Sequence, residues 1–323
     1  MKFVVTALAL AVPAYFYTQF VWSIDRYEKE PPLYLLYAFV WGAAPAIVAA
    51  VVLQGLLSVP IEWLFGQDNF VGDFTQVTVG APVTEEVLKG MAIALIFITR
   101  RQEFDGWVDG IVYGATAGFG FAYVENIFYL MQTPTWEDWF VLFVLRALVF
   151  GGLHGFWTAL TGIGFGLARY TRDRLMQVFI IAGGLLLAIV GHLVHNAAAT
   201  LVEVTNGQSF SLAMLNYSVL TALMVALWWI AGVIDRARLK QYLQDEVPTI
   251  IPEGMYWAIC DRGYTAKLAA IGVPEARQAQ LLQLAGELAQ KKLQLAKMGN
   301  EGGNTSEITQ LRMALVEFIS RIG

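Results

Sequence analysis

Residues 107–130 read WVDGIVYGATAGFGFAYVENIFYL, and this run is the clearest indication of the fold. It is mostly apolar, and Asp109 and Glu125 are its only charged residues. A helix needs about 20 mostly apolar residues to cross a membrane, because each residue rises about 1.5 Å and the hydrocarbon core is about 30 Å thick. The run therefore predicts a transmembrane helix that carries a carboxylate within the bilayer.

The composition of the whole chain agrees with that prediction. Of 323 residues, 57% are hydrophobic and 15% are charged, whereas a typical globular domain is roughly 45–50% apolar and about 25% charged. The net charge of −5 argues against a nucleic-acid partner. The single cysteine, Cys260, excludes an intramolecular disulfide and a cysteine-rich metal site. We predict an all-α integral membrane protein that does not bind nucleic acid.

Seven runs of the chain are long and apolar enough to cross a bilayer, which predicts a polytopic bundle of about seven helices. The first run could instead be a cleaved signal peptide, because Lys2 precedes it, although the run is longer than the usual apolar part of such peptides. The expected spans are residues 3–22, 33–57, 74–98, 107–130, 139–168, 175–201 and 212–234.

The charges of the loops indicate the orientation of the chain in the membrane. The loops after the second, fourth and sixth spans contain no Lys or Arg and carry acidic residues instead. Because Lys and Arg resist translocation, we expect the N-terminus outside the cell and the C-terminus in the cytoplasm. The basic residues follow the odd-numbered spans, at Arg26, Lys29, Arg100, Arg101, Arg169, Arg172, Arg174, Arg236, Arg238 and Lys240.

The composition changes near residue 235, which predicts two parts: a transmembrane core of residues 1–234 and a cytoplasmic helical appendage of residues 235–323. The 11 Lys and Arg residues of the appendage nearly balance its 10 Asp and Glu residues, so it is not a polybasic lipid-binding tail. We interpret it either as a solvated tail without a specific function or as a module that docks a cytoplasmic partner or a second copy of the chain.

The appendage itself is expected to form a helical hairpin. Pro248 and Pro252 break the chain after the last span, and residues 274–298 have apolar side chains near helical spacing. Residues 299–304 read as a loop, and a last helix is expected to end near residue 322.

Among the polar and charged residues inside the expected spans, ten are the informative ones for function. A charged residue in the middle of a span costs about 2.5–3.5 kcal/mol on insertion scales. Such residues therefore need one another, water or a ligand, and we expect them to face the interior of the bundle. They are Glu85, Glu86, Lys89, Glu125, Asn126, Arg146, His154, His192, His195 and Asn196.

Four of these residues are expected to meet at one depth. Counting about 1.5 Å per residue from each cytoplasmic end puts Glu85 and His154 at about 20 Å, His192 at about 25 Å and Glu125 at about 28 Å. Glu125 also lies on the helix face marked by Gly110, Gly114 and Gly118, whose spacing permits a neighbouring helix to approach closely. The pattern predicts a polar layer in the outer half of the bilayer.

Carboxylates and imidazoles in a confined site point to activation of water. A glutamate can act as a general base, or two histidines and a carboxylate can hold a metal ion that lowers the pKa of bound water. Glu85 and Glu86 point about 100° apart on a helix, so we expect one to face the reacting water and the other to brace a neighbouring helix. The chain contains no HExxH zinc-protease helix, no GxGxxG loop and no P-loop.

Four short patterns follow one another along the expected spans. Residues 85–89, EEVLK, match an EExxK motif, and residues 121–126, FAYVEN, match FxxxEN. His154 with Thr158 forms a third pattern, and residues 192–196, HLVHN, match HxxxN. In this order they resemble the motifs of the PrsW family of intramembrane proteases, which is related to the CAAX prenyl endopeptidases and the bacteriocin-processing-type membrane proteases.

The resemblance implies a multi-pass intramembrane endopeptidase of the bacterial plasma membrane that cleaves a single-span, membrane-anchored protein such as an anti-sigma factor on its extracytoplasmic side. It implies a general-base role for the two acids of the first motif. Zinc, held by His154, His192 and Glu125, is one form of the chemistry, and glutamate without metal is the other. The implied catalytic residues are Glu85, Glu86, Glu125, His154 and His192.

The remaining polar residues are expected to support that site. We interpret Lys89 and Arg146 as counter-ions and His195 as a packing neighbour, and Asn126 and Asn196 belong to the second and fourth motifs.

Two other functions remain open from the sequence. A proton-coupled or ion-coupled transporter could use the same buried Glu, His and Lys residues, and it would predict inverted repeats and broken helices. The two halves of the chain show no convincing self-similarity. A non-catalytic membrane scaffold that kept the pocket is the third hypothesis.

Overall fold

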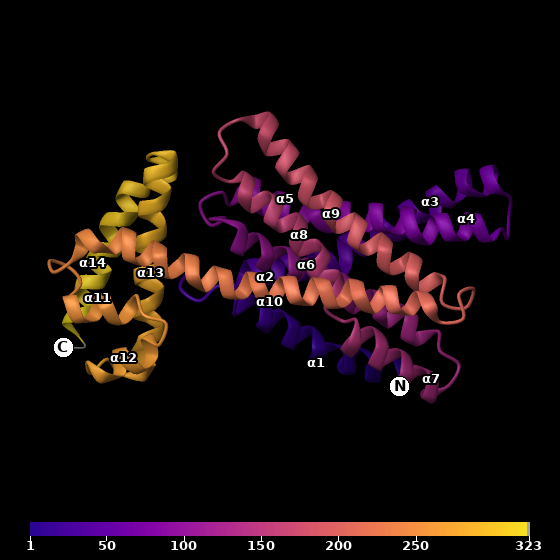
Figure 1. The fold of residues 1–323 in the computed structure, drawn as a ribbon, viewed down its shortest axis with the longest axis horizontal. Coiled ribbons are helices and arrows are strands. Elements are labelled where there is room, and N and C mark those ends of the chain that lie inside the picture. Colours follow the sequence, from indigo (N-terminus) through magenta and orange to yellow (C-terminus); the bar gives the residue numbers. More distant parts are fainter. Residues whose placement is uncertain (322–323) are drawn as a thin grey trace. The chain divides into compact units, whose positions relative to one another are not determined.

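The computed structural model describes residues 1–321, and within those residues it contains helices and no strand (Figure 1). The chain divides into two compact units. The first comprises Met1–Ser23 and Glu30–Ala226, and the second comprises Ile24–Lys29 and Leu227–Gly323. The boundary lies inside a long helix, and the expected functional division after residue 234 stays a prediction.

The first unit is a bundle of helices with three short π-helical segments, η1 to η3, inserted between them. Its elements are α1 (Lys2–Trp22), α2 (Pro32–Trp41), η1 (Gly42–Ala46), α3 (Ile47–Phe65), α4 (Phe70–Thr75), η2 (Gln76–Gly80), α5 (Ala81–Thr99), α6 (Trp107–Met131), α7 (Trp136–Phe143), η3 (Val144–Val149), α8 (Leu153–Ala168), α9 (Arg174–Thr200) and the first part of α10 (Gln208–Leu243).

Within residues 1–321, five segments are long and apolar enough to cross a membrane, which establishes a multi-pass helical protein. The expected spans 74–98 and 107–130 also form helices, but α5 carries three charged residues and α6 is mostly buried inside the bundle. The count of seven spans and their orientation therefore stay predictions. The five segments are Lys2–Trp22, Pro32–Phe65, Trp136–Ala168, Arg174–Thr200 and Gln208–Glu246.

Helix α6 lies at the centre of the first unit and packs closely against α8. A Cβ atom added at Gly110 would lie 2.0 Å from the carbonyl oxygen of Gly162, and one at Gly118 would lie 2.3 Å from that of His154. Between them, a Cβ atom at Gly114 would lie 2.6 Å from the carbonyl oxygen of Thr158. The expected close approach along this glycine face is confirmed, because any side chain there would collide with backbone.

The backbone is irregular at three places in the expected spans. Segment η1 contains Pro45, and η2 ends at Gly80, two residues before Pro82. The span expected at 139–168 is broken at residues 150–152, between η3 and α8. Such irregularities are tolerated within a membrane where they lie inside protein or line a cavity, and π-helical turns are frequent at functional sites.

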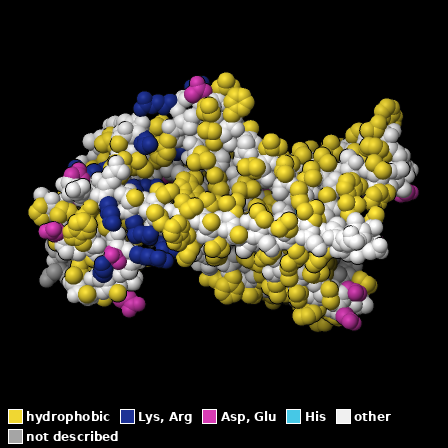
Figure 2. Space-filling view, viewed as in Figure 1, with side chains coloured by type: hydrophobic (Ala, Val, Ile, Leu, Met, Phe, Trp, Pro, Cys, Tyr) yellow, Lys and Arg dark blue, Asp and Glu magenta, His cyan; other side chains and the backbone are white. Residues whose placement is uncertain are grey.

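The outer surface of the first unit is apolar along its helices. Figure 2 shows hydrophobic side chains covering α3 and α9. Large apolar residues on these helices are exposed, such as Val48 at 63% and Leu187 at 60%. In the same view, basic side chains lie by the turn between α8 and α9, and acidic side chains lie by the tip between α3 and α4 and near α7. Exposed apolar helices with charged ends are what contact with lipid requires.

The second unit has its own hydrophobic core, formed by side chains such as Leu243, Ile259, Leu281 and Leu315. The expected helices after residue 274 are present, and the sequence analysis missed the two short helices before them. Its elements are the end of α10, η4 (Gln244–Glu246), α11 (Glu253–Ile259), α12 (Tyr264–Ala270), α13 (Glu275–Met298), η5 (Glu301–Gly303) and α14 (Asn304–Ser320).

A buried carboxylate ties this second unit together. Glu246 forms salt bridges of 2.7 Å with both Lys292 of α13 and Arg312 of α14. The charge of the Glu246 side chain, which is 3% exposed, is thereby neutralised by residues that lie 46 and 66 positions later in the chain. Docking of a partner by this unit stays a prediction.

The glycine contact between α6 and α8 can be tested by two matched substitutions. Gly110→Ala should lower the melting temperature of the purified chain in detergent, because overpacking a close contact costs about 1–3 kcal/mol. Gly183→Ala in α9 should leave the melting temperature equal or higher, because nothing lies within 4 Å of the added Cβ atom there and Ala favours a helix by about 1 kcal/mol over Gly. Equal melting temperatures for the two variants would contradict the packing described above.

Candidate active site

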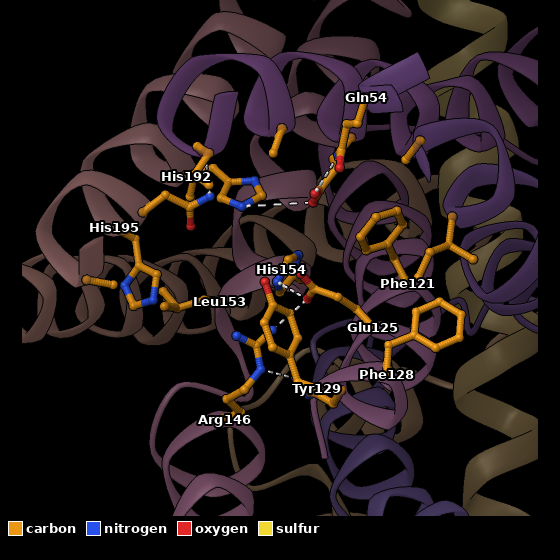
Figure 3. A pocket seen from close by; sticks show the side chains of 18 of the residues that line it. Gln54, Phe121, Glu125, Phe128, Tyr129, Arg146, Leu153, His154, His192 and His195 are labelled. Carbon is orange, nitrogen blue, oxygen red and sulfur yellow. Dashed lines mark hydrogen bonds and ion pairs between the residues drawn. The ribbon is translucent and has the colours of Figure 1, made fainter. Parts of the chain in front are cut away.

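Four helices of the first unit bring their polar side chains to one place (Figure 3). Glu85, Glu86 and Lys89 come from α5, Glu125 from α6, His154 from α8 and His192 from α9. The sequence predicted that these groups would meet, and in the structure they lie together. The close packing of α6 on α8 fixes the two helices that carry Glu125 and His154.

Glu86 is the most tightly held acid of the group. Its Oε1 lies 2.5 Å from Nζ of Lys89 and 3.0 Å from Nδ1 of His192, and its Oε2 accepts a hydrogen bond of 2.9 Å from the hydroxyl of Thr158. The side chains of Glu86 and Lys89 are both 0% exposed. Glu86 therefore links α5 to α8 and α9, and it fixes the orientation of the His192 ring.

Glu85 is held on one side only. Its Oε1 accepts a hydrogen bond of 3.2 Å from Nε2 of Gln54 in α3. Its Oε2 has no hydrogen-bond partner among the described residues, and it lies 3.9 Å from Nε2 of His192 and 3.7 Å from Nζ of Lys89. The adjacent acids thus point in different directions, as the helical geometry predicted. Glu85 is the acid that keeps a carboxylate oxygen without a hydrogen-bond partner among the described residues.

His154 lies between two charged partners. Its Nε2 is 3.0 Å from Oε2 of Glu125, and its Nδ1 is 3.2 Å from Nζ of Lys89. Arg146 bonds the same Glu125 oxygen at 2.8 Å and donates from Nε to Oδ1 of Asn126 at 2.7 Å. Arg146 belongs to η3, before the break in the helix, so it reaches Glu125 from a different segment than His154 does.

Aromatic rings and the fourth motif complete the walls. The Trp157 ring stacks on His192 with centroids 4.1 Å apart and an angle of 11°. His195 packs edge-on against Phe150, with centroids 4.9 Å apart, and its Nδ1 has no hydrogen-bond partner among the described residues. Asn196 donates a hydrogen bond of 3.0 Å to the carbonyl oxygen of Val77 in η2. The packing role expected for His195 stays a prediction.

These side chains surround a cavity of about 620 Å³, drawn in Figure 3. Glu86 and Lys89 do not line it and lie behind its wall. Residues from η2 and η3 do line it, which places two of the three irregular segments at the site. The expected residues that line the cavity are Glu85, Glu125, Asn126, Arg146, His154, His192, His195 and Asn196.

The sequence analysis missed several residues of this cavity. Gln54 and Gln76 are polar residues inside expected spans, so their position could have marked them, but neither belongs to a motif. Gln76 donates a hydrogen bond of 3.0 Å to the carbonyl oxygen of Gln54 and so steadies the residue that bonds Glu85. The ring centroid of Tyr129 lies 3.8 Å from the Arg146 guanidinium. The sequence did not mark Tyr129 as a site residue, because aromatic residues are common throughout the chain.

One group of donors could hold a metal ion. Ligand atoms of Glu85, His154 and His192 all lie within 4.8 Å of one another. The carboxylate of this group differs from the expected one, because Glu125 is already bonded by Arg146 and His154.

The three residues fit a metal by their chemistry. Two imidazoles and a carboxylate are a common zinc donor set, and a carboxylate on the second ring nitrogen, as Glu86 is on His192, typically orients a ligating histidine. The unpartnered Oε2 of Glu85 is available to such an ion. His154 would exchange one of its two present contacts for the metal, since both of its ring nitrogens are engaged.

Comparison with known proteins agrees with the geometry. The sequence model of a family described as PrsW family intramembrane metalloprotease matches residues 30–230. The chain is similar to Protease PrsW of Geobacillus kaustophilus, with 29% identity over 51% of this chain and 64% of the relative. It is also similar to Protease PrsW of Bacillus subtilis, with 29% identity over 69% of this chain and 88% of the relative.

A third relative, Protease PrsW of Shouchella clausii, is 26% identical over 69% of this chain and 92% of its own length. No solved structure matches the chain. The transporter and scaffold hypotheses gain no support from these relatives, all of which are named as proteases.

The family match covers more than half of the chain, and it contains every residue of the cavity described above. The relatives are bacterial, and the apolar helices make this chain a multi-pass membrane protein. Because the family model matches residues 30–230, the chain belongs to the PrsW family of intramembrane metalloproteases.

Proposed function

We propose that this chain hydrolyses a peptide bond of a single-span membrane protein in the cavity between α3, α6 and α9, with water activated at Glu85. The observation that carries the proposal is the difference between the adjacent acids. Glu86 is saturated by Lys89, His192 and Thr158, whereas Glu85 lines the cavity and keeps an oxygen without a hydrogen-bond partner.

In this proposal Glu85 is the general base. It takes a proton from water as the water oxygen attacks the scissile carbonyl carbon, and it returns that proton to the amine nitrogen when the C–N bond breaks. Gln54 acts as a positioning residue, because its amide holds Oε1 and leaves Oε2 directed towards His192. Glu86 positions the His192 ring, and Arg146 keeps the charge of Glu125 balanced beside His154.

The metal-assisted alternative uses zinc, which Glu85, His154 and His192 would hold, and Glu85 would then be a ligand of the ion instead of the general base. A bound zinc ion polarises a carbonyl and lowers the pKa of bound water to about 7. Glu85 is required in both forms of the chemistry, as a base without metal or as part of the metal-binding group. His192 is the better prepared of the two histidines, because Glu86 bonds its Nδ1 and its Nε2 faces Glu85.

The position of the cavity supports a cut on the extracytoplasmic side. Its lining residues lie late in α6 and α9, so Glu125 and His192 are each 18 residues, or about 27 Å, from the helix ends that adjoin Arg101 and Arg172. Under the proposed orientation those basic ends are cytoplasmic. Apolar wall residues such as Val51 and Phe128 suit a membrane segment, and the resemblance implies an anti-sigma factor as the substrate.

The roles of the two acids can be separated by isosteric substitutions in the full chain reconstituted in liposomes with a single-span reporter. Glu85→Gln should lower the cleavage rate about 100-fold or more, because the general base is lost, and it should leave the melting temperature near that of the wild type. Glu86→Gln should lower the melting temperature as well as the rate, because it leaves the buried Lys89 with only the longer contact to Glu85, and breaking a buried ion pair costs about 3–5 kcal/mol.

The exposed acid Glu137 supplies the control for both variants, and Glu137→Gln should change neither measurement. Undiminished cleavage by Glu85→Gln would refute Glu85 as the base. Loss of cleavage by Glu86→Gln alone, at an unchanged melting temperature, would transfer that role to Glu86.

The metal proposal predicts that elemental analysis of the purified chain finds a single zinc ion, which a chelator removes together with cleavage. His192→Ala should abolish zinc binding, because it removes the ring that faces Glu85, whereas His195→Ala should retain zinc, because His195 is outside the donor group. A zinc-free chain that cleaves the reporter at the full rate would reject zinc and leave Glu85 as a base without metal.

The orientation predicts the accessibility of single cysteines in intact cells. Glu137→Cys should react with a membrane-impermeant maleimide from outside, and Arg174→Cys should react only after the cells are permeabilised. The native Cys260 should stay unlabelled, because burial raises the pKa of its thiol to about 11 and thiolate is the reactive form. Labelling of Arg174→Cys in intact cells would reverse the proposed orientation.

A further inference from the structure

A second cavity lies on the surface of the first unit, between α2 and α5. It has a volume of about 650 Å³ and shares no lining residue with the cavity of the proposed active site. Its walls are mostly apolar: Leu36, Val40 and Pro45 line it from α2 and η1, and Leu95 and Ile96 line it from α5. We call this cavity the α2–α5 groove.

The α2–α5 groove has the length of one membrane leaflet. Its lining runs from Leu33 to Pro45, which is about 18 Å at about 1.5 Å per residue. Half of a hydrocarbon core of about 30 Å is about 15 Å. Leu33, Leu36 and Val40 are 70%, 59% and 50% exposed, so the groove opens towards the surroundings of the protein rather than into its interior. A lipid acyl chain could lie along it.

One end of the groove carries a positive charge. Arg100 lines the groove directly after the end of α5, and it is exposed. Its guanidinium lies 5.7 Å from the ring centroid of Tyr34, which also lines the groove, and no carboxylate of the described residues forms a salt bridge with it. A cation at the boundary of an apolar groove is complementary to a phosphate headgroup placed above an acyl chain.

A second copy of this chain would be a poorer occupant at that end. The turn between α8 and α9, which is expected on the same side of the membrane, carries Arg169, Arg172 and Arg174 against the single acid Asp173. Another copy in parallel orientation that placed this turn at the groove would bring like charges towards Arg100, whereas an acidic lipid brings an opposite charge.

We propose that the α2–α5 groove binds a phospholipid with an acidic headgroup, whose phosphate contacts Arg100 and whose acyl chain lies between α2 and α5. The bound lipid fills the exposed side of the α2–α5 contact. Trp41, which lines the groove, donates a hydrogen bond of 3.0 Å from Nε1 to the carbonyl oxygen of Leu88, one residue before Lys89. The lipid thus supports the helix that carries Glu85 and Glu86, and its binding does not depend on proteolysis.

Native mass spectrometry of the full chain, titrated with phosphatidylglycerol or phosphatidylcholine in detergent, tests this proposal. The wild type should retain phosphatidylglycerol more strongly than phosphatidylcholine. Arg100→Gln should weaken phosphatidylglycerol binding about fivefold, because one basic residue at a membrane surface contributes a factor of that order. Arg100→Lys should bind like the wild type, since a lysine keeps the charge.

Arg174→Gln is the matched control, because Arg174 is also exposed and begins a membrane helix but does not line the groove. Val40→Trp provides a variant without a change of charge: it should fill the groove and reduce the retention of both lipids, at an unchanged melting temperature. Equal retention of the two lipids by the wild type would overturn the proposal. Wild-type retention of phosphatidylglycerol by either Arg100→Gln or Val40→Trp would overturn it as well.

Discussion

The ion pair between Glu86 and Lys89 is the interaction on which the first unit depends. Both side chains are fully buried, and neither charge could remain there alone, because an unpaired ion inside apolar surroundings is very costly. The pair is local, three residues apart on α5, but its remaining hydrogen bonds are not. They go to Thr158 of α8 and His192 of α9, so the charge of Glu86 is satisfied only when three helices are in place.

That constraint leaves one oxygen of Glu85 without a hydrogen-bond partner among the described residues. The i and i+4 positions place Glu85 near the same lysine, but at 3.7 Å, and the closer acid takes most of the ammonium's interaction. Glu85 is then directed into the cavity by Gln54, which approaches from α3. Two identical side chains that are neighbours in sequence thereby obtain different environments, which is how one can support the structure while the other is proposed to act on water.

The backbone around the cavity contributes as much as the side chains. Contact between glycines lets α8 approach α6 until the carbonyl of His154 lies against Gly118, and this proximity brings His154 to Glu125. The break at residues 150–152 separates η3 from α8 and allows Arg146 to reach Glu125 from another direction. Irregular backbone of this kind is tolerated inside a membrane where it lines a cavity, because its polar groups are then not exposed to lipid.

The sequence by itself determined the membrane-helix class, the family motifs and the set of polar residues, because apolar runs and buried charges obey rules that need no neighbours. It could not distinguish the contacts of Glu85 from those of Glu86, place Gln54 beside Glu85, or put Glu85 rather than Glu125 in the candidate donor group with His154 and His192. Those outcomes depend on which helix lies opposite each side chain. Only the tertiary structure decides this, since helical periodicity specifies a face but not the partner that the face meets.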